Sequence, residues 1–303
     1  MTLLAVGSIA FDDLETPVGL RANLLGGSAT YFSISASNFC PVQLVAVVGD
    51  DFGPAEESVY LDRSINLDGV IHQPGSCFRW KGSYGTDLNE ARTIQTDLNV
   101  FADFVPNLPD HYKDAPYLFL GNIDPRLQLE VVNQMSIRPK WIALDTMNYW
   151  IDGSRDALVK VLKEIDILLI NEAEAKSLAK ELNVLKAAKA ITNMGPNTVV
   201  VKRGEYGALL VAPNICFPVP AIPMENVIDP TGAGDTFAGG FLGSLASQGD
   251  LEEASLRQAM LAGTVMASFT IEDFGVERIA SAKKSEIQER LKHFSRLLGL
   301  SGL

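Results

Sequence analysis

Uninterrupted runs of apolar residues recur along the chain, and most of them stop at glycine, aspartate or asparagine. Such runs are typical of parallel strands that helices cover on both faces. They predict strands over 3–8, 43–48, 117–121, 141–145, 166–170 and 198–202. From residue 117 onward, a segment of helical length separates each run from the next. The pattern therefore predicts an α/β fold with a doubly wound, mostly parallel sheet between layers of helices.

The segments around these strands add helices and two departures from the alternating pattern. Helices are predicted over 28–39, 54–64, 233–247 and 251–269, with a surface helix over 283–297. Residues 207–212 and 215–219 are predicted to form a late hairpin. Residues 69–95 instead hold short β-like runs separated by turn residues, which predict a small antiparallel patch.

Length and composition favour a single large core. The chain has 303 residues, of which 47% are hydrophobic and 20% are charged, so we expect one domain over residues 1–303. No run reaches the roughly 18 apolar residues of a membrane span. The first residues lack the basic start of a signal peptide. We therefore expect a cytoplasmic protein.

The charge balance narrows the range of partners. The net charge of −12 gives a surface that repels nucleic acid phosphates and anionic membranes, so neither is an expected partner. Cys40, Cys77 and Cys216 are odd in number and far apart, which argues against a disulfide framework or a zinc site. We expect a small-molecule substrate. A phosphorylated ligand would need backbone N–H groups, a few local bases or a metal ion.

The most informative segment is DPTGAGDTF, at 229–237, which opens a predicted helix rich in small residues. Gly232, Ala233 and Gly234 leave their backbone N–H groups open at the helix start, and these donors with the helix dipole form an anion site. Asp235 beside such a site can take a proton from a hydroxyl that attacks a phosphoryl group. The segment therefore predicts a general base next to an anion hole.

The longer string DPTGAGDTFAGGF resembles the C-terminal signature of the ribokinase-like (PfkB) family of sugar and nucleoside kinases. Other blocks of that family follow in order, namely GSIAFD at 7–12, paired glycines at 26–27, GDDFG at 49–53, NEAE at 171–174 and GEYG at 204–207. The resemblance spans about residues 3–275. It implies an ATP-dependent kinase with a three-layer ribokinase-like fold and a small β-rich lid over about 12–27 and 69–105.

The resemblance also implies roles on the nucleotide side of the site. ATP would be bound by Asn171, Lys202, Gly204 and Gly207. Mg²⁺ and the ATP phosphates would be organised, largely through water, by Asn171 and Glu174, while a monovalent cation such as K⁺ would be held by Asp229 and Thr231. Three of these residues have a plainer alternative, since Glu174 can cap a helix, Asp229 can be a turn acid, and Lys202 can lie on the surface.

On the acceptor side, Asp12 is the candidate ligand for substrate hydroxyls. Asp13 is its rival, because a shift of one residue in the alignment would exchange the two. Gly26 and Gly27 would supply close backbone approach and a hinge for the lid. Tyr31 stands where ribokinases proper often carry an asparagine, and it can contact the substrate or simply pack.

The predicted lid carries side chains that can meet either a ligand or a second subunit, so a homodimer through the lid is a further expectation. They are Phe78, Arg79, Trp80, Lys81, Tyr84, Asn89 and Arg92. Because Ala10 and Tyr31 replace two asparagines of ribokinases proper, the residues do not identify ribose, fructose or adenosine as the substrate.

The residues and the resemblance leave several candidate functions. A sugar or related polyol is the first expected acceptor, and a nucleoside is the alternative. A catalytically inactive, ligand-binding regulator is a third hypothesis, against which Asp235 and the anion hole argue. A Rossmann dehydrogenase fails because no GxGxxG follows the first strand.

Overall fold

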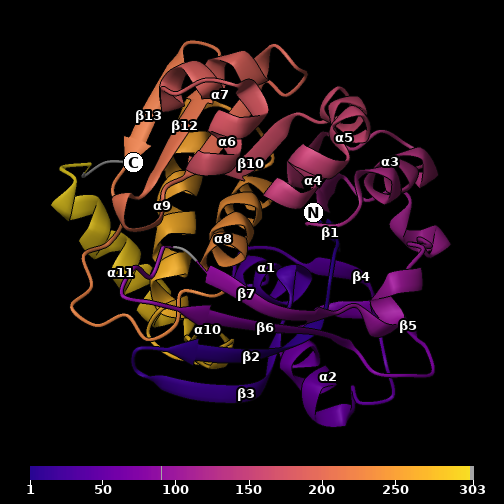
Figure 1. Cartoon of the computed structure of the whole chain (residues 1–303). Helices are drawn as coiled ribbons and strands as arrows, with labels where there is room; N and C mark the ends of the chain where they lie inside the picture. The colour runs from indigo at the N-terminus through magenta and orange to yellow at the C-terminus, as the bar shows by residue number, and fades with distance from the viewer. Residues whose placement is uncertain (90, 301–303) are drawn as a thin grey trace.

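The computed structural model describes residues 1–89 and 91–300 and contains two β-sheets (Figure 1). The larger sheet has nine strands in the order β13-β12-β11-β10-β9-β8-β1-β4-β5. Its strands are β1 (Leu3–Val6), β4 (Val42–Val48), β5 (Asn66–His72), β8 (Tyr117–Leu120), β9 (Trp141–Asp145), β10 (Ile167–Asn171), β11 (Thr198–Lys202), β12 (Ala208–Ala212) and β13 (Ile215–Val219). Neighbours pair in parallel except at one edge, where β12 pairs antiparallel with β11 and β13. The mostly parallel sheet and the late hairpin are therefore confirmed.

Helices cover both faces of the nine-stranded sheet. They are α1 (Ser28–Ala36), α2 (Pro54–Leu61), α3 (Pro125–Gln134), α4 (Asn148–Gly153), α5 (Arg155–Leu162), α6 (Glu172–Ala179), α7 (Val184–Thr192), α8 (Ala233–Gln248), α9 (Glu253–Thr270), α10 (Glu277–Ser281) and α11 (Lys284–Leu297). Short 3₁₀ turns occupy Asn99–Asp103, Asp110–Tyr112 and Gly204–Tyr206. The predicted helices are present, although α1 ends at Ala36 rather than near residue 39.

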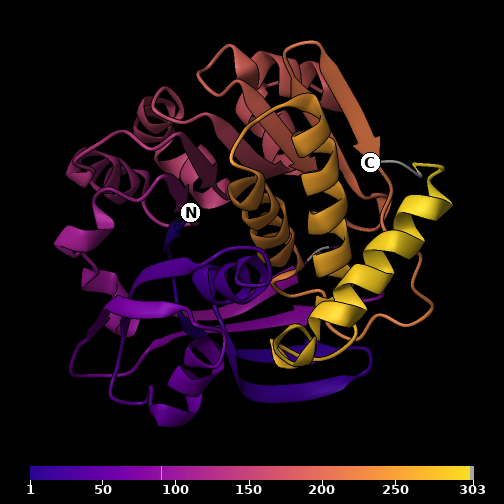
Figure 2. The same ribbon diagram turned by 180° about the vertical axis from the view of Figure 1, so that it is seen from behind.

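Two apolar cores separate along the strands because successive side chains point to opposite faces. In β1, Leu3 and Ala5 join the core under α1, α8 and α9, whereas Leu4 and Val6 join the core under α3, α5, α6 and α7. In Figure 2, α11 runs along the outer side of α9, to which it packs. These strands are buried on both faces, which explains their uninterrupted apolar sequences.

The second sheet has four strands in the order β3-β2-β6-β7, and we call it the lid sheet. Its strands are β2 (Ala10–Thr16), β3 (Gly19–Gly26), β6 (Phe78–Tyr84) and β7 (Ala91–Asp97). The predicted antiparallel patch over 69–95 is confirmed for its last two runs, because β6 and β7 pair antiparallel. It is wrong for the first run, because residues 69–72 lie in β5, parallel to β4 in the main sheet. The run GVIH is short and half-buried, so its pattern does not distinguish the two sheets.

The carboxyl ends of the parallel strands meet on one edge of the main sheet, where ligands of open α/β sheets bind. Asp145, Asn171 and Lys202 stand at the ends of neighbouring strands there. In the described part of the chain, no helix has the length and apolarity that crossing a membrane requires.

Candidate active site

The first turn of α8 forms the floor of the site. Gly232 precedes the helix with φ of 72°, a left-handed conformation that favours glycine, and a methyl group there would collide with the ring of Tyr31. Ala233, Gly234 and Asp235 follow in the first turn. The N–H of Ala233 donates to the carbonyl oxygen of Pro230 at 3.2 Å, so the prediction of an open donor is wrong for Ala233. Burial, and then the negative charge of Asp145, raise the pKa of Asp235 to about 7, while Lys202 opposes this shift. That pKa suits a general base near neutral pH.

A buried ion pair stands beside this turn. Nζ of Lys202 donates to Oδ2 of Asp145 at 2.5 Å, and the two side chains are 17% and 5% exposed. Oδ1 of Asp145 accepts from the backbone N–H of Thr146 at 2.8 Å, so both carboxylate oxygens are held. The alternative of a surface lysine at 202 is therefore wrong. Asp145 was assigned no role from the sequence, and its signal was its position as the last residue of a buried strand.

Asn171 and Glu174 form a reciprocal cap at the start of α6. Oδ1 of Asn171 accepts from the N–H of Glu174 at 2.8 Å, and Oε2 of Glu174 accepts from the N–H of Asn171 at 3.0 Å. The plainer interpretation of Glu174 as a capping residue is thus correct as far as Oε2 is concerned. Burial is the main cause that raises the pKa of Glu174 to about 7. Among the described residues, none donates a hydrogen bond to Oε1 of Glu174.

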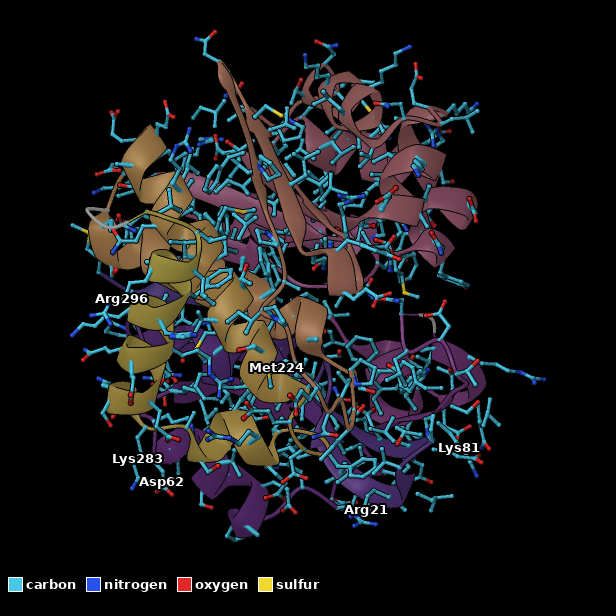
Figure 3. The ribbon with its side chains drawn as sticks, turned by 90° about the vertical axis from the view of Figure 1, so that its left-hand side faces the viewer. Arg21, Asp62, Lys81, Met224, Lys283 and Arg296 are labelled. Atoms are coloured by element: carbon cyan, nitrogen blue, oxygen red, sulfur yellow. The ribbon has the colours of Figure 1, made fainter. Side chains whose placement is uncertain are left out.

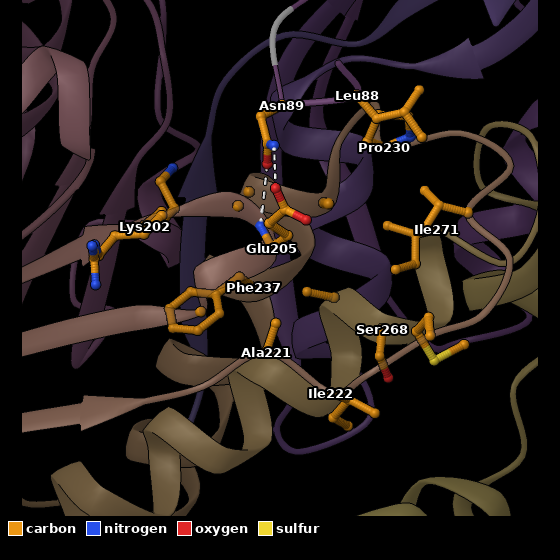
Figure 4. Close-up of a pocket in the computed structure, with 18 of the residues that line it drawn as sticks. Leu88, Asn89, Lys202, Glu205, Ala221, Ile222, Pro230, Phe237, Ser268 and Ile271 are labelled. Atoms are coloured by element: carbon orange, nitrogen blue, oxygen red, sulfur yellow. Dashed lines mark hydrogen bonds between the residues drawn. The ribbon is translucent and has the colours of Figure 1, made fainter. Parts of the chain in front are cut away.

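A cavity of about 780 Å³ opens between these strand ends, α8, α9 and the tip of the lid sheet (Figure 4). Its polar side includes Asn171, Lys202, Gly204, Gly207 and Gly234. Its apolar side includes Ile222, Val227, Phe237, Ala267 and Ile271. A polar end next to an apolar slot of this size can accept a nucleotide, with phosphates at the anion hole and the base against the apolar wall. The predicted nucleotide residues are therefore brought together.

The β6–β7 hairpin closes one wall of this cavity, which sequence reasoning did not anticipate. Asn89 bonds Glu205 twice at 3.2 Å, its Oδ1 accepting from the backbone N–H and its Nδ2 donating to Oε1 (Figure 4). The hydroxyl of Thr231 donates to that of Tyr84 at 3.0 Å. The hairpin thus contacts both the Gly204–Gly207 turn and the loop before α8.

The structure distinguishes the two rival aspartates, because neighbours in a strand face opposite ways. Asp12 is 4% exposed, and burial, followed by the charges of Asp229, Asp235 and Asp13, raises its pKa to about 8. Asp13 instead accepts from the backbone N–H of Asn23 at the exposed side of the lid sheet. Asp12 is therefore buried near Asp229 and Asp235, whereas Asp13 bonds the backbone on the exposed side.

The paired glycines leave room that this arrangement requires. A side chain at Gly26 would collide with Oδ2 of Asp12. Gly27 has φ of 93°, and a side chain there would collide with the backbone at Ser8. Both residues join β3 to α1, where the lid sheet meets the main body.

Tyr31 lies close to Asp12 and Asp229, and its ring packs against Gly232 before α8. It is 1% exposed, and its hydroxyl has no partner among the described residues. Burial, then the charges of Asp12 and Asp229, raise the pKa of Tyr31 well above its usual value, so the hydroxyl stays neutral. A buried hydroxyl without a partner is costly, which points to a polar group that arrives with a ligand.

Asp229 is fully buried and ties two loops together. Its Oδ1 accepts from the N–H of Thr231 at 2.9 Å, and its Oδ2 accepts from the N–H of Gly275 at 3.0 Å. These bonds agree with the interpretation of Asp229 as a turn acid. Cation binding by Asp229 and Thr231 stays a prediction.

The lid bases lie away from this centre. Arg79 donates to Asp51 at 2.7 Å and to Asn23 at 3.0 Å. Lys81 is exposed at the edge of the molecule (Figure 3).

The geometry agrees with three comparisons. Residues 22–282 match the pfkB family carbohydrate kinase domain. The chain belongs to this family. A cytidine kinase of Thermococcus kodakarensis is 30% identical over 258 residues, which cover 84% of this chain and 91% of that protein. A nucleoside kinase of Methanothermobacter thermautotrophicus is 27% identical, with 91% of each chain covered.

Solved structures of other kinases share the fold. A putative ribokinase II from E. coli, in complex with ATP and Mg²⁺, has a TM-score of 0.80 at 19% identity and covers 96% of this chain and 99% of its own. The nucleoside kinase of Methanocaldococcus jannaschii has a TM-score of 0.76 at 18% identity, with 96% and 98% covered. This chain is therefore a ribokinase-like, ATP-dependent kinase of sugars or nucleosides.

Proposed function

We propose that this PfkB kinase phosphorylates a hydroxyl of a neutral, ribose-like acceptor, with a nucleoside as the first candidate. The observation that carries the proposal is the setting of Asp12, which is buried among charges that are all negative. A carboxyl group can bond two neighbouring hydroxyls, one at each oxygen, and with a pKa of about 8 Asp12 does so mainly in its protonated form, donating to one hydroxyl and accepting from the other. The same acidic setting repels a phosphorylated acceptor, and Arg79 is already paired with Asp51.

The cytidine kinase and nucleoside kinase among the relatives support the nucleoside as first candidate. A free sugar is the second candidate. It is favoured by Tyr31, whose ring packs against Gly232 and narrows the space between Asp12 and the anion hole. The inactive regulator is the weakest candidate, because a protein that only binds a ligand has no use for a base with the raised pKa of Asp235.

Asp235 performs the chemistry in this proposal. The carboxylate accepts the proton of the acceptor hydroxyl as that oxygen attacks the terminal phosphorus of ATP. The bond from this phosphorus to the bridging oxygen breaks, and ADP leaves. The N–H groups of Gly232 and Gly234 donate to the transferring phosphoryl group, and the N–H of Ala233 joins them only by leaving the carbonyl of Pro230.

ATP occupies the cavity between Lys202, the Gly204–Gly207 turn and α8 in this proposal. Mg²⁺ bound to its phosphates would offset part of their negative charge. Glu174 and Asn171 fit a hydrated Mg²⁺ because they offer oxygen donors at the polar end of this cavity, with Oε1 of Glu174 open to water.

The lid sheet excludes water from this site in our proposal, with Gly26 and Gly27 as its hinge. Water would otherwise compete with the acceptor for the phosphoryl group. Hydrogen exchange of β2, β3, β6 and β7 tests this. We expect slower exchange in the presence of acceptor and ADP, and equal exchange with and without them would refute the closure.

The acceptor is identified by ADP release with ATP and Mg²⁺ against a panel of neutral compounds. The panel contains cytidine, uridine, adenosine, inosine, ribose and fructose. We expect turnover with a nucleoside to exceed turnover with any free sugar. Turnover with a sugar alone would replace the first candidate by the second, and no turnover with any acceptor would refute both.

A further inference from the structure

The nucleotide end of the site is rich in acids and poor in cations. Asp145, Glu174 and Asp235 surround Lys202, and their charges all act on it. Among the described residues that line the cavity, the cations are Lys202 and Arg203. Arg203 is held by Glu172, with Nε 2.6 Å from Oε2. Lys202 is therefore the cation left to face a phosphoryl group.

Lys202 does not extend straight from its strand. It ends β11, while Asp145 ends β9, and β10 runs between them. Lys202 is level with Asn171 in β10, whereas Asp145 is level with Leu169, so the lysine side chain reaches back across β10. The backbone N–H of Thr146 fixes the other oxygen of Asp145. The carboxylate thus sets the direction of the lysine.

This direction brings the ammonium group to the anion hole. A methyl group on Gly234 would lie 3.3 Å from Nζ of Lys202, so the missing side chain leaves Nζ open toward the first turn of α8. Burial alone would lower the pKa of Lys202, but the charges of Asp145, Asp235 and Glu174 outweigh it and raise the pKa. The ammonium group therefore stays charged at neutral pH.

We propose that Asp145 holds Lys202 so that its ammonium group donates to the phosphoryl group as it is transferred from ATP. Lys202 is then a catalytic residue, and Asp145 is a positioning residue that acts through it. The inference rests on the proposed phosphoryl transfer and adds to the base and the amides a fixed cation. Charge on the phosphoryl oxygens is stabilised best by groups already oriented before the reaction.

A purely structural pair is the competing explanation, since a buried carboxylate needs a partner wherever it stands. Lys202→Met alone would leave Asp145 buried and unpaired, and the variant could fail to fold. Lys202→Met combined with Asp145→Asn removes both charges, so it separates folding from catalysis. Lys176→Met is the matched control, because Lys176 pairs with Glu172 at the same 2.5 Å but does not line the cavity.

We expect the double variant to melt near the wild-type temperature and to bind ADP within about threefold of wild type, while kcat falls about 100-fold or more. Asp145→Asn alone should lower kcat about tenfold, and its effect should vanish when Lys202 is already methionine. Lys202→Arg should regain part of the rate lost in Lys202→Met. A double variant with kcat within about threefold of wild type would overturn the proposal.

A binding measurement distinguishes failure of this inference from failure of the proposed function. The ratio of affinities for a non-hydrolysable ATP analogue and for ADP reports contact with the terminal phosphoryl group without any acceptor. We expect the double variant to lose about tenfold in this ratio relative to wild type and to Lys176→Met. An unchanged ratio would contradict the role of Lys202, whereas a wild type that phosphorylates no acceptor would refute only the proposed function.

Discussion

The acceptor half of the site, around Asp12, and the nucleotide half, around Lys202, differ in the charges that surround the bound group. On the acceptor half, Asp12 and Asp229 are buried together with Tyr31, and the charges acting on Asp12 are all negative. The nucleotide half holds acids as well, but Lys202 stands among them and lines the cavity together with Gly234 of the first turn of α8. Asp235 stands at the boundary. The difference suggests that charge assigns the substrates to their halves, the anionic donor to one and a neutral acceptor to the other.

Replacing Asp235 should have the largest effect on turnover. We expect Asp235→Asn to lower kcat by roughly 100-fold or more, the usual scale for loss of a general base. ADP affinity should change little, because the amides of α8 remain. Steady-state kinetics and calorimetric titration with ADP measure the two quantities. Turnover close to wild type would exclude Asp235 as the base.

The acceptor half can be tested separately from the nucleotide half. We expect Asp12→Ala to raise KM for the acceptor by about 30- to 100-fold, since two hydrogen bonds to the acceptor are lost. KM for ATP should stay within about twofold. Asp13→Ala is the matched control, because Asp13 faces Asn23 on the other side of the strand. An acceptor KM that rises only in Asp13→Ala would reverse the assignment.

Breaking the contact between the lid hairpin and the Gly204–Gly207 turn should have a smaller effect on the kinetics. Asn89→Ala removes two hydrogen bonds to Glu205, so we expect KM for ATP to rise about three- to tenfold. Gln95→Ala, which changes an exposed residue of the same hairpin, should leave it unchanged. If KM for ATP is the same in both variants, the hairpin does not contribute to nucleotide binding.

Replacing Asp12 should raise the stability of the protein while it lowers activity. Its pKa is about 8 in the folded protein against a usual value of 3.8, so the unfolded state loses this proton before the folded state does, and folding stability falls as pH rises from about 4 to 8. We expect Asp12→Asn to raise the melting temperature by a few degrees at pH 8 and by less at pH 5. A variant that melts lower at pH 8 than wild type would contradict this burial effect.

The sequence predicted most of the frame because the strands are buried on both faces and their apolar runs are continuous. The GVIH run was assigned to the wrong sheet because its half-buried pattern fits an edge strand of either one. Asp12 and Asp13 could not be separated until the strand direction fixed which side each faces.

The pairs that complete the site were beyond sequence reasoning. Asp145 and Lys202 are 57 residues apart, and Asn89 and Glu205 are 116 apart. Neither pair carries a local pattern, because the contact exists only once β9, β10 and β11 are side by side and the lid sheet has reached the turn after β11. The signature at 229–237 was different, since its donors and its base lie within one turn.

The central claim is that charge separates the acceptor from the donor, and one comparison tests it most directly. If cytidine is an acceptor, kcat/KM is measured for cytidine, its 3′-O-methyl derivative and its 3′-phosphate. All three keep the 5′-hydroxyl, and the methyl derivative corrects for the lost hydroxyl donor. We predict that the phosphate lowers kcat/KM at least about tenfold below the methyl derivative, because it adds negative charge beside Asp12. A phosphate derivative used as well as the methyl derivative would contradict the account.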